Sequence, residues 1–229
     1  MFMLALLCSM KSAVALDAAY GVAPRTADGI GKTYMGREIA QVMGYPGADW
    51  LERGSRQMEE RPDLLLAALD LKPGMTVADV GAGTGYYSWQ IAERVGATGR
   101  VDAVDVQPEM IALLKERMRQ RGVRNVQAVL GTSADTGLAP GTVDLALMVD
   151  VYHELDRPRE ILDSILRALR PGGRLVLVEY RAEDDKVPIK RLHKMSVDQI
   201  RREVGAAGLV WQQTVETLPW QHIVIFSKP

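Results

Sequence analysis

The first residues with a chemical pattern are three alternating glycines. Gly81, Gly83 and Gly85 follow a short apolar run, 76–80, that is typical of a buried strand. Glycines at such a strand-to-helix turn let a ligand come close to backbone N–H groups. A dinucleotide-binding G-x-G-x-x-G pattern needs a glycine at position 86, where this chain has Tyr86. The loop therefore predicts a ligand on the backbone, and an NAD-dependent oxidoreductase is the less favoured alternative.

An acidic residue follows the loop at the spacing expected for a ribose contact. Asp105 lies near the end of a second apolar run, 101–106, and 20 residues after Gly85. A carboxylate at the end of the second strand can accept hydrogen bonds from two ribose hydroxyls. The loop and this acid together indicate a ligand that contains adenosine.

The elements that position these residues follow an alternating order. From Thr76 onward, short apolar runs alternate with amphipathic segments, which is typical of βα units and a parallel sheet. Strands are expected at 76–80, 101–106, 125–131, 143–149 and 174–180, and helices at 62–71, 85–95, 108–122, 158–169 and about 196–207. Two late runs, 209–216 and 220–226, predict an antiparallel hairpin. The expected fold is a doubly wound, mostly parallel seven-stranded sheet, with its ligand beyond the carboxyl ends of the strands.

The composition restricts the possible partners. The net charge is -1 and the pI about 6.3, whereas nucleic-acid binders carry a basic excess for phosphate contacts. A small molecule or a protein is therefore the expected partner, and the oligomeric state stays open. The single cysteine, Cys8, allows no disulfide within the chain and no cysteine-based metal site. No metal is expected.

Four motifs in this order resemble the class I, or seven-β-strand, S-adenosylmethionine-dependent methyltransferases. They are VADVGAGTGYYS (77–88), Asp105, VDLALMVDVYHEL (143–155) and LRPGGRLVLVEY (169–180). The resemblance covers residues 62–229 and includes the closing hairpin. It implies a Rossmann-like methyltransferase domain over this range, with S-adenosyl-L-methionine as cofactor and S-adenosyl-L-homocysteine as product.

The resemblance also implies which residues hold the cofactor. The glycine loop would carry its methionine portion and sugar, Asp79 its amine, and Asp105 its ribose. Asp135 would accept from the adenine amino group, although an Asx-turn is an almost equal alternative for a residue in this turn-rich segment. The expected cofactor-binding residues are Asp79, Gly81, Ala82, Gly83, Gly85, Asp105, Val106, Ser133, Ala134, Asp135, Val149 and Asp150.

The expected reaction is an in-line displacement that needs little from the protein besides positioning. A general base is needed only for an acceptor that arrives protonated. The candidate catalytic residues are His153, His193 and Tyr152, with His153 after the fourth strand and His193 in the loop after the fifth. Both histidines also have a purely structural alternative.

The acceptor is not specified by any motif. No Asn-Pro-Pro-Tyr tetrad follows the fourth strand, no Asp-Asn pair follows the fifth, and arsenite methylation would need several cysteines. A small-molecule acceptor methylated on O, S, N or C is therefore expected. The alternatives are a protein-methylating member and a non-catalytic cofactor-binding protein.

The N-terminal part precedes the methyltransferase domain. Residues 17–61 are expected to form a helical cap segment, with short helices over 37–60 broken at 45–47. Residues 1–16 are an apolar tail or a possible export signal, since Ala13-Val14-Ala15 fits a cleavage site but no basic region comes first. The apolar run is too short to span a bilayer. The cytoplasm is favoured because the cofactor is supplied there, and export from a signal in residues 1–15 is the alternative.

Overall fold

A seven-stranded sheet forms the centre of the molecule. The structure is a computed structural model that describes residues 19–229, so the predictions for residues 1–16 lie outside the described residues. The strand order is β10-β11-β8-β7-β4-β5-β6, and the two-residue β9 adds to β8. Strands β4 to β8 are parallel, β9 pairs parallel with β8, and β11 is antiparallel to both β8 and β10. The bounds are β4 Thr76–Val80, β5 Arg100–Asp105, β6 Val126–Leu130, β7 Val143–Val149, β8 Leu169–Arg181, β9 Lys194–Met195, β10 Val210–Val215 and β11 Gln221–Ser227.

This arrangement confirms the predicted fold class. The central strands β4 and β7 are buried on both faces, and they read as unbroken apolar runs for that reason. The late hairpin is present as predicted, but β11 inserts between β8 and β10, so the last strand of the chain pairs with the last parallel strand.

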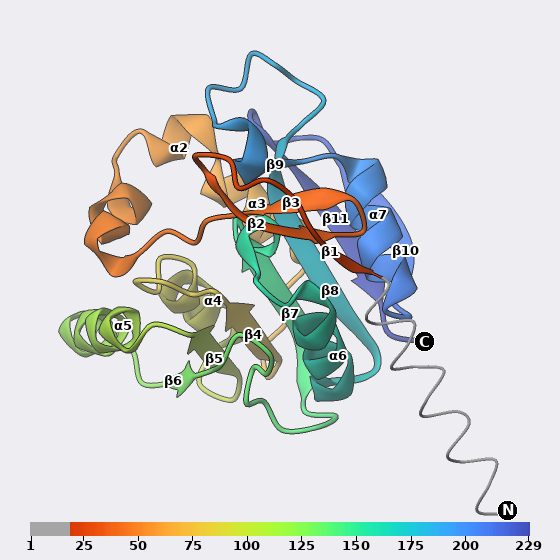
Figure 1. Cartoon of the computed structure of the whole chain (residues 1–229). Coiled ribbons are helices and arrows are strands. Elements are labelled where there is room, and N and C mark those ends of the chain that lie inside the picture. Colours follow the sequence, from red (N-terminus) through yellow and green to blue (C-terminus); the bar gives the residue numbers. More distant parts are fainter. Residues whose placement is uncertain (1–18) are drawn as a thin grey trace, which may run out of the picture.

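Helices cover both faces of the sheet (Figure 1). On one face, α6 and α7 pack with β7 and β8; on the other, α3 and α4 pack with the same sheet. Three of the helices begin at a proline, which fits the first helical position. The Ser196 hydroxyl caps α7 by accepting from the Gln199 amide at 3.2 Å. The bounds are α3 Pro62–Ala68, α4 Ser88–Val95, α5 Pro108–Arg121, α6 Pro158–Ala168 and α7 Val197–Ala206.

The N-terminal segment differs from its prediction. It begins with a three-stranded antiparallel sheet, so the helical cap predicted for residues 17–61 is wrong for its first half. Strands β2 and β3 join at Met35-Gly36, both at positive φ (47° and 88°), which is the backbone of a tight hairpin turn. Helical turns follow only later. The bounds are β1 Tyr20–Val22, β2 Gly29–Tyr34, β3 Arg37–Ala40, η1 Tyr45–Glu52 and α2 Arg56–Glu59.

The small sheet is fastened to the large domain by polar contacts. The Arg37 guanidinium pairs with Glu203 of α7 through two hydrogen bonds of 3.0 and 3.1 Å. The Tyr20 hydroxyl donates to Glu160 of α6. In Figure 1 the small sheet, in red and orange, lies across the end of the large one. Among residues 19–229, no helix combines the length and the apolar character needed to cross a bilayer.

Candidate active site

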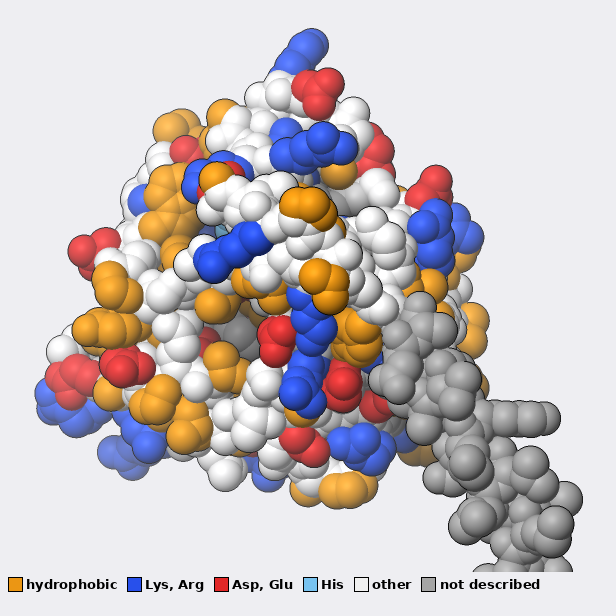
Figure 2. Space-filling view, viewed as in Figure 1, with side chains coloured by type: hydrophobic (Ala, Val, Ile, Leu, Met, Phe, Trp, Pro, Cys, Tyr) orange, Lys and Arg blue, Asp and Glu red, His pale blue; other side chains and the backbone are white. Residues whose placement is uncertain are grey.

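A cavity of about 830 Å³ lies between the carboxyl ends of the parallel strands and the N-terminal segment. Its floor comes from the loops after β4, β5 and β7, and its cover from β2, β3 and η1. Most of its side chains are apolar, including Ile30, Met43, Val106, Val151 and Ile189. On the outside, hydrophobic side chains gather over η1 and α2, on the left of the face shown in Figure 2. The cavity therefore joins the glycine loop to an apolar chamber built partly by residues 30–56.

The glycine loop is anchored to β5 and shaped to receive a ligand. The Gly81 and Ala82 amides both donate to the Val104 carbonyl, at 2.8 and 2.9 Å. A Cβ on Gly81 would lie 2.5 Å from a methyl carbon of Val151, and a Cβ on Gly83 would lie 2.6 Å from one of Leu51. Both glycines also have positive φ. Side chains at either position would therefore take up space in the cavity wall.

Asp105 connects the loop to the next helix. Its carboxylate accepts from the Gly83 amide and from the Gln107 amide, each at 2.9 Å. Burial raises the pKa of this carboxyl above its ordinary value. Val106 beside it is 46% exposed and lies on the cavity wall, where a flat apolar ring could cover it. This floor fits an adenosine cofactor: glycines for close approach, an acid for the ribose and an apolar side chain for the base.

Some predicted cofactor residues lie on the cavity wall and others do not. On the wall are Gly81, Gly83, Asp105, Val106, Ser133, Val149 and Asp150. Asp79 instead accepts from the Ser88 hydroxyl at 2.6 Å, and burial raises its pKa to about 6. Gly85 lies against α5, where a Cβ would meet Leu114 and Met118. The described residues predicted for the cofactor but placed off the wall are Asp79, Ala82, Gly85, Ala134 and Asp135.

The predicted adenine contact of Asp135 is wrong in this structure. Its carboxylate accepts from the Gly137 amide at 2.8 Å and from the Ser164 hydroxyl at 3.1 Å, and it pairs with Arg167. This is the Asx-turn alternative, and Asp135 is not among the residues that line the cavity.

Tyr152 is also misassigned as a catalytic residue. It is fully buried in the core under the Arg37 guanidinium, 5.8 Å from its ring centroid, and it is not on the cavity wall.

The two predicted histidines come together on the cavity wall. His153 lies in the short helix η2 (Tyr152–Glu154), and His193 in η3 (Arg191–His193). The His153 Nε2 and His193 Nδ1 atoms are 3.1 Å apart. On its other side, His153 Nδ1 lies 2.6 Å from the carboxylate of the buried Glu179 in β8. Such a chain can either pass a proton or present two imidazole nitrogens to a cation.

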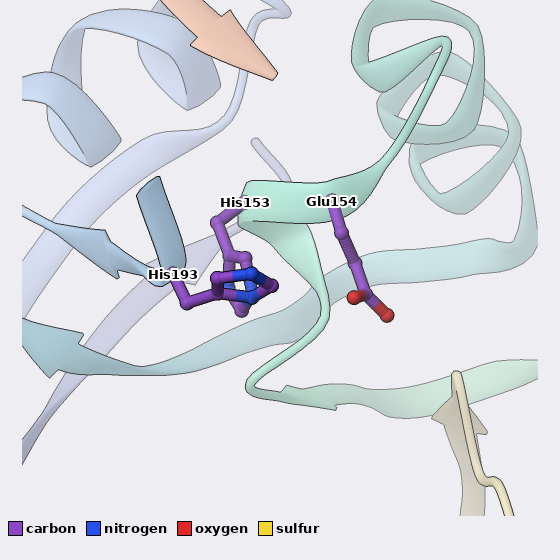
Figure 3. A group of neighbouring side chains, drawn as sticks. All are labelled: His153, Glu154 and His193. Carbon is purple, nitrogen blue, oxygen red and sulfur yellow. The ribbon is translucent and has the colours of Figure 1, made fainter. Parts of the chain in front are cut away.

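A carboxylate completes this group. Glu154 projects from η2 on the same side as the two imidazole rings (Figure 3). Ligand atoms of His153, Glu154 and His193 all lie within 4.8 Å of one another. The Glu154 carboxylate accepts from the Met43 amide at 3.1 Å, which ties it to the cover of the cavity. Burial raises the pKa of Glu154 to about 7.

Asp150 occupies the wall between the glycine loop and the histidines. It has φ +55°, which is unusual for a residue with a side chain. One carboxylate oxygen accepts from the Gln221 amide nitrogen at 2.7 Å, and the other is buried without a protein partner among the described residues. Burial and the nearby Glu60 raise its pKa well above the ordinary value. An unpartnered acceptor at this point fits a donor on a bound ligand, such as an ammonium group.

The comparison with protein families decides the assignment. A family model described as a methyltransferase domain matches residues 71–221. The chain belongs to this methyltransferase family. An S-adenosylmethionine-dependent methyltransferase from Aquifex aeolicus has a similar structure, with a TM-score of 0.78 and 27% sequence identity. That likeness covers 82% of this chain and all of the other.

Other relatives of this methyltransferase differ in what they act on. An arsenite methyltransferase of Halobacterium salinarum is 33% identical over 47% of this chain and 27% of its own length. A ubiquinone/menaquinone biosynthesis C-methyltransferase of Idiomarina loihiensis is 31% identical over 48% of this chain and 44% of its own. A protein-L-isoaspartate O-methyltransferase of Methanothrix thermoacetophila is 30% identical over 57% of this chain and 60% of its own length. The chain thus spans about a quarter to three fifths of these curated relatives.

The fold alone does not determine the chemistry of such a protein. A 4+2 cyclase has the same fold, with a TM-score of 0.60 and 16% identity over 81% of both chains. The acceptor of this methyltransferase must therefore be inferred from its own cavity.

Sequence reasoning missed the residues that only the tertiary structure brings to the site. Glu179 lies inside the apolar run 174–180, and a lone acid in a buried strand was a usable signal. Met43 and Leu51 carry no such signal, because the strands and turns that aim them at the cavity depend on contacts with the large domain.

Proposed function

We propose that the protein transfers a methyl group from S-adenosylmethionine to an apolar small molecule. One observation carries this proposal: a single cavity of about 830 Å³ joins the glycine loop and Asp105 to an apolar chamber that ends at two histidines. Pockets for small ligands typically measure about 300–1,000 Å³. The cavity is therefore large enough for a cofactor and an acceptor side by side.

The cofactor half is assigned to residues of the floor. Gly81 and Gly83 would receive it on the backbone, Asp105 would accept from its ribose, and Val106 would cover its adenine. The unpartnered oxygen of Asp150 would accept from its ammonium group. When bound, the cofactor supplies an activated methyl group, so the protein's main task is to align the acceptor.

The acceptor half is assigned to the chamber under the N-terminal segment. Ile30, Met43 and Ile189 give it an apolar lining, and His153 and His193 are the residues that meet the reactive group of the acceptor. An apolar acceptor is also consistent with the name of one relative, the ubiquinone/menaquinone biosynthesis C-methyltransferase. Arsenite is a poor candidate, because Cys8 is the only cysteine of the sequence. The net charge of -1 also gives no support to a nucleic-acid acceptor.

Methyl transfer from isotopically labelled S-adenosylmethionine to a panel of acceptors tests the proposal. The panel contains phenols, quinols, thiols, carboxylates and amines, with an isoaspartyl peptide to represent protein methylation. We expect turnover with one apolar small-molecule class. Turnover with the peptide alone would assign the protein-methylating alternative, and failure to bind S-adenosylhomocysteine would remove the cofactor assignment.

A further inference from the structure

We propose that His153, Glu154 and His193 form a binding site for one divalent transition-metal cation, of the Zn²⁺ type, at the acceptor end of the cavity. Their ligand atoms lie within 4.8 Å of one another, and the three side chains face the same space (Figure 3). Two imidazoles and one carboxylate are the ligands of known catalytic zinc sites, which keep a further position open. This inference replaces the expectation from the sequence that no metal is bound.

The spacing of the two nitrogens supports a shared cation. His153 Nε2 and His193 Nδ1 are 3.1 Å apart. Two nitrogens bound to one tetrahedral Zn²⁺ at about 2.0–2.1 Å would lie about 3.3 Å apart. The two imidazoles would therefore need only a small adjustment, and the partly buried Glu154 carboxylate a larger one, to reach the same ion.

Glu179 prepares His153 for this role. Its buried carboxylate lies 2.6 Å from His153 Nδ1, and because a carboxylate accepts hydrogen bonds, this contact favours the tautomer in which Nδ1–H is the donor. The lone pair of His153 Nε2 then points toward His193 and the cavity. A carboxylate behind a histidine ligand is the usual outer contact of metal sites, where it fixes the orientation of the ring.

The charges of the surroundings also favour a cation. Glu179 and Glu154 lie beside the histidines, and Asp150 lies on the neighbouring wall. The cationic side chains around the cavity are paired with carboxylates: Arg37 with Glu203, Lys190 with Asp28, and both Arg53 and Arg56 with Glu60. A bound divalent cation would stabilise the charged form of these buried carboxyl groups.

The open position of the cation would face the apolar chamber. Zn²⁺ binds oxygen and sulfur anions and lowers the pKa of the group that it binds. The site therefore selects an acceptor with a hydroxyl or thiol on an apolar body. This assignment of the acceptor rests on the proposed function, whereas the cation site itself does not.

Metal binding by the full chain tests the site directly. After dialysis against a chelator, we expect titration with Zn²⁺ to show one site, and Co²⁺ to give visible absorption typical of nitrogen and oxygen ligands. His193→Ala and Glu154→Gln should each weaken Zn²⁺ binding at least tenfold. Glu179→Gln should weaken it by about 10–100-fold through the orientation of His153. His222→Gln, which changes the one histidine outside the group, should bind as the wild type does.

The outcomes separate this inference from the proposed function. Absence of stoichiometric Zn²⁺ and Co²⁺ binding would overturn the cation site, as would equal affinity in His193→Ala, Glu154→Gln and the wild type. If S-adenosylhomocysteine binding and methyl transfer then persisted in chelator-treated protein, the proposed function would stand, with the histidines as a direct proton acceptor. Zn²⁺ binding without any S-adenosylhomocysteine binding would support the site and remove the function.

Discussion

The carboxylate of Asp105 accepts a hydrogen bond from the backbone amide of Gly83 at 2.9 Å, so the acid of β5 holds the loop that follows β4. The two strands are neighbours in the sheet, and this contact joins their ends at the cavity floor. The predicted ribose acid and the predicted glycine loop are therefore one structural unit.

We expect Asp105→Asn to weaken S-adenosylhomocysteine binding by roughly 10–100-fold. The substitution removes a charged acceptor, and a hydrogen bond to a charged group contributes about 1.5–3 kcal/mol. Calorimetric titration of the variant measures the loss. Glu109→Gln, a change to an exposed acid in the first turn of α5, is the control and should leave the affinity unchanged. Equal affinity in Asp105→Asn and the wild type would remove Asp105 from the site.

Gly81→Ala should abolish cofactor binding because the added side chain occupies the cavity wall, and not only because it strains the backbone. An alanine Cβ there would lie 2.5 Å from Val151 in the cavity wall. Gly172→Ala is a matched control, because Gly172 has a similar φ of +72° but no neighbour within 4 Å of an added Cβ. Both variants should lose about 1–2 kcal/mol of stability from the left-handed backbone. Only Gly81→Ala should lose S-adenosylhomocysteine binding. Equal loss of binding in both variants would contradict the assignment of Gly81 to the cofactor site.

The stability of the protein should fall as the pH rises from 4 to 6, in part because of Asp79. Burial raises its pKa from 3.8 to about 6, so the native state keeps a proton that the unfolded chain releases. The difference corresponds to about 3 kcal/mol above pH 6. Asp79→Asn should therefore gain stability relative to the wild type between pH 4.5 and 7, measured by urea unfolding. The exposed Asp198→Asn serves as control, and a pH-independent difference for Asp79→Asn would disprove this assignment.

Arg37→Ala should destabilise the protein by about 3–5 kcal/mol. It leaves the fully buried carboxylate of Glu203 without its cation. Arg61→Ala breaks an exposed pair with Asp63 and should destabilise the protein far less than Arg37→Ala does. Urea unfolding of both variants makes the comparison. The double variant Arg37→Met with Glu203→Met should recover much of the stability that Arg37→Ala loses. If it does not, Arg37 stabilises the protein mainly through its hydrogen bond to the His153 carbonyl and not through its pair with Glu203.

The large sheet was predictable because local patterns determine it. Buried parallel strands read as short apolar runs, and β4 and β7 begin and end at the predicted residues. The small sheet was not predictable in the same way. Its strands are partly exposed and short, and the Met35-Gly36 turn has methionine where a hairpin turn usually has asparagine, aspartate or glycine before its glycine.

The candidate site was predictable for residues whose place in the site depends only on their position along a strand. Asp105 follows from its place at the end of β5. Asp135 fails because Ser164 and Arg167, far along the chain on α6, hold its carboxylate. The pairing of His153 with His193 depends on how the loop after β8 returns to the sheet, and no spacing rule contains that information.

The glycine loop and the two histidines line one continuous cavity. A single synthetic compound could therefore reach both, with an adenosine-like portion linked to an apolar tail. Its second portion would bind as part of the same molecule, so its affinity could exceed that of either portion by a large factor. The cover formed by residues 30–56 would then determine which tails distinguish this enzyme from relatives that share only its floor.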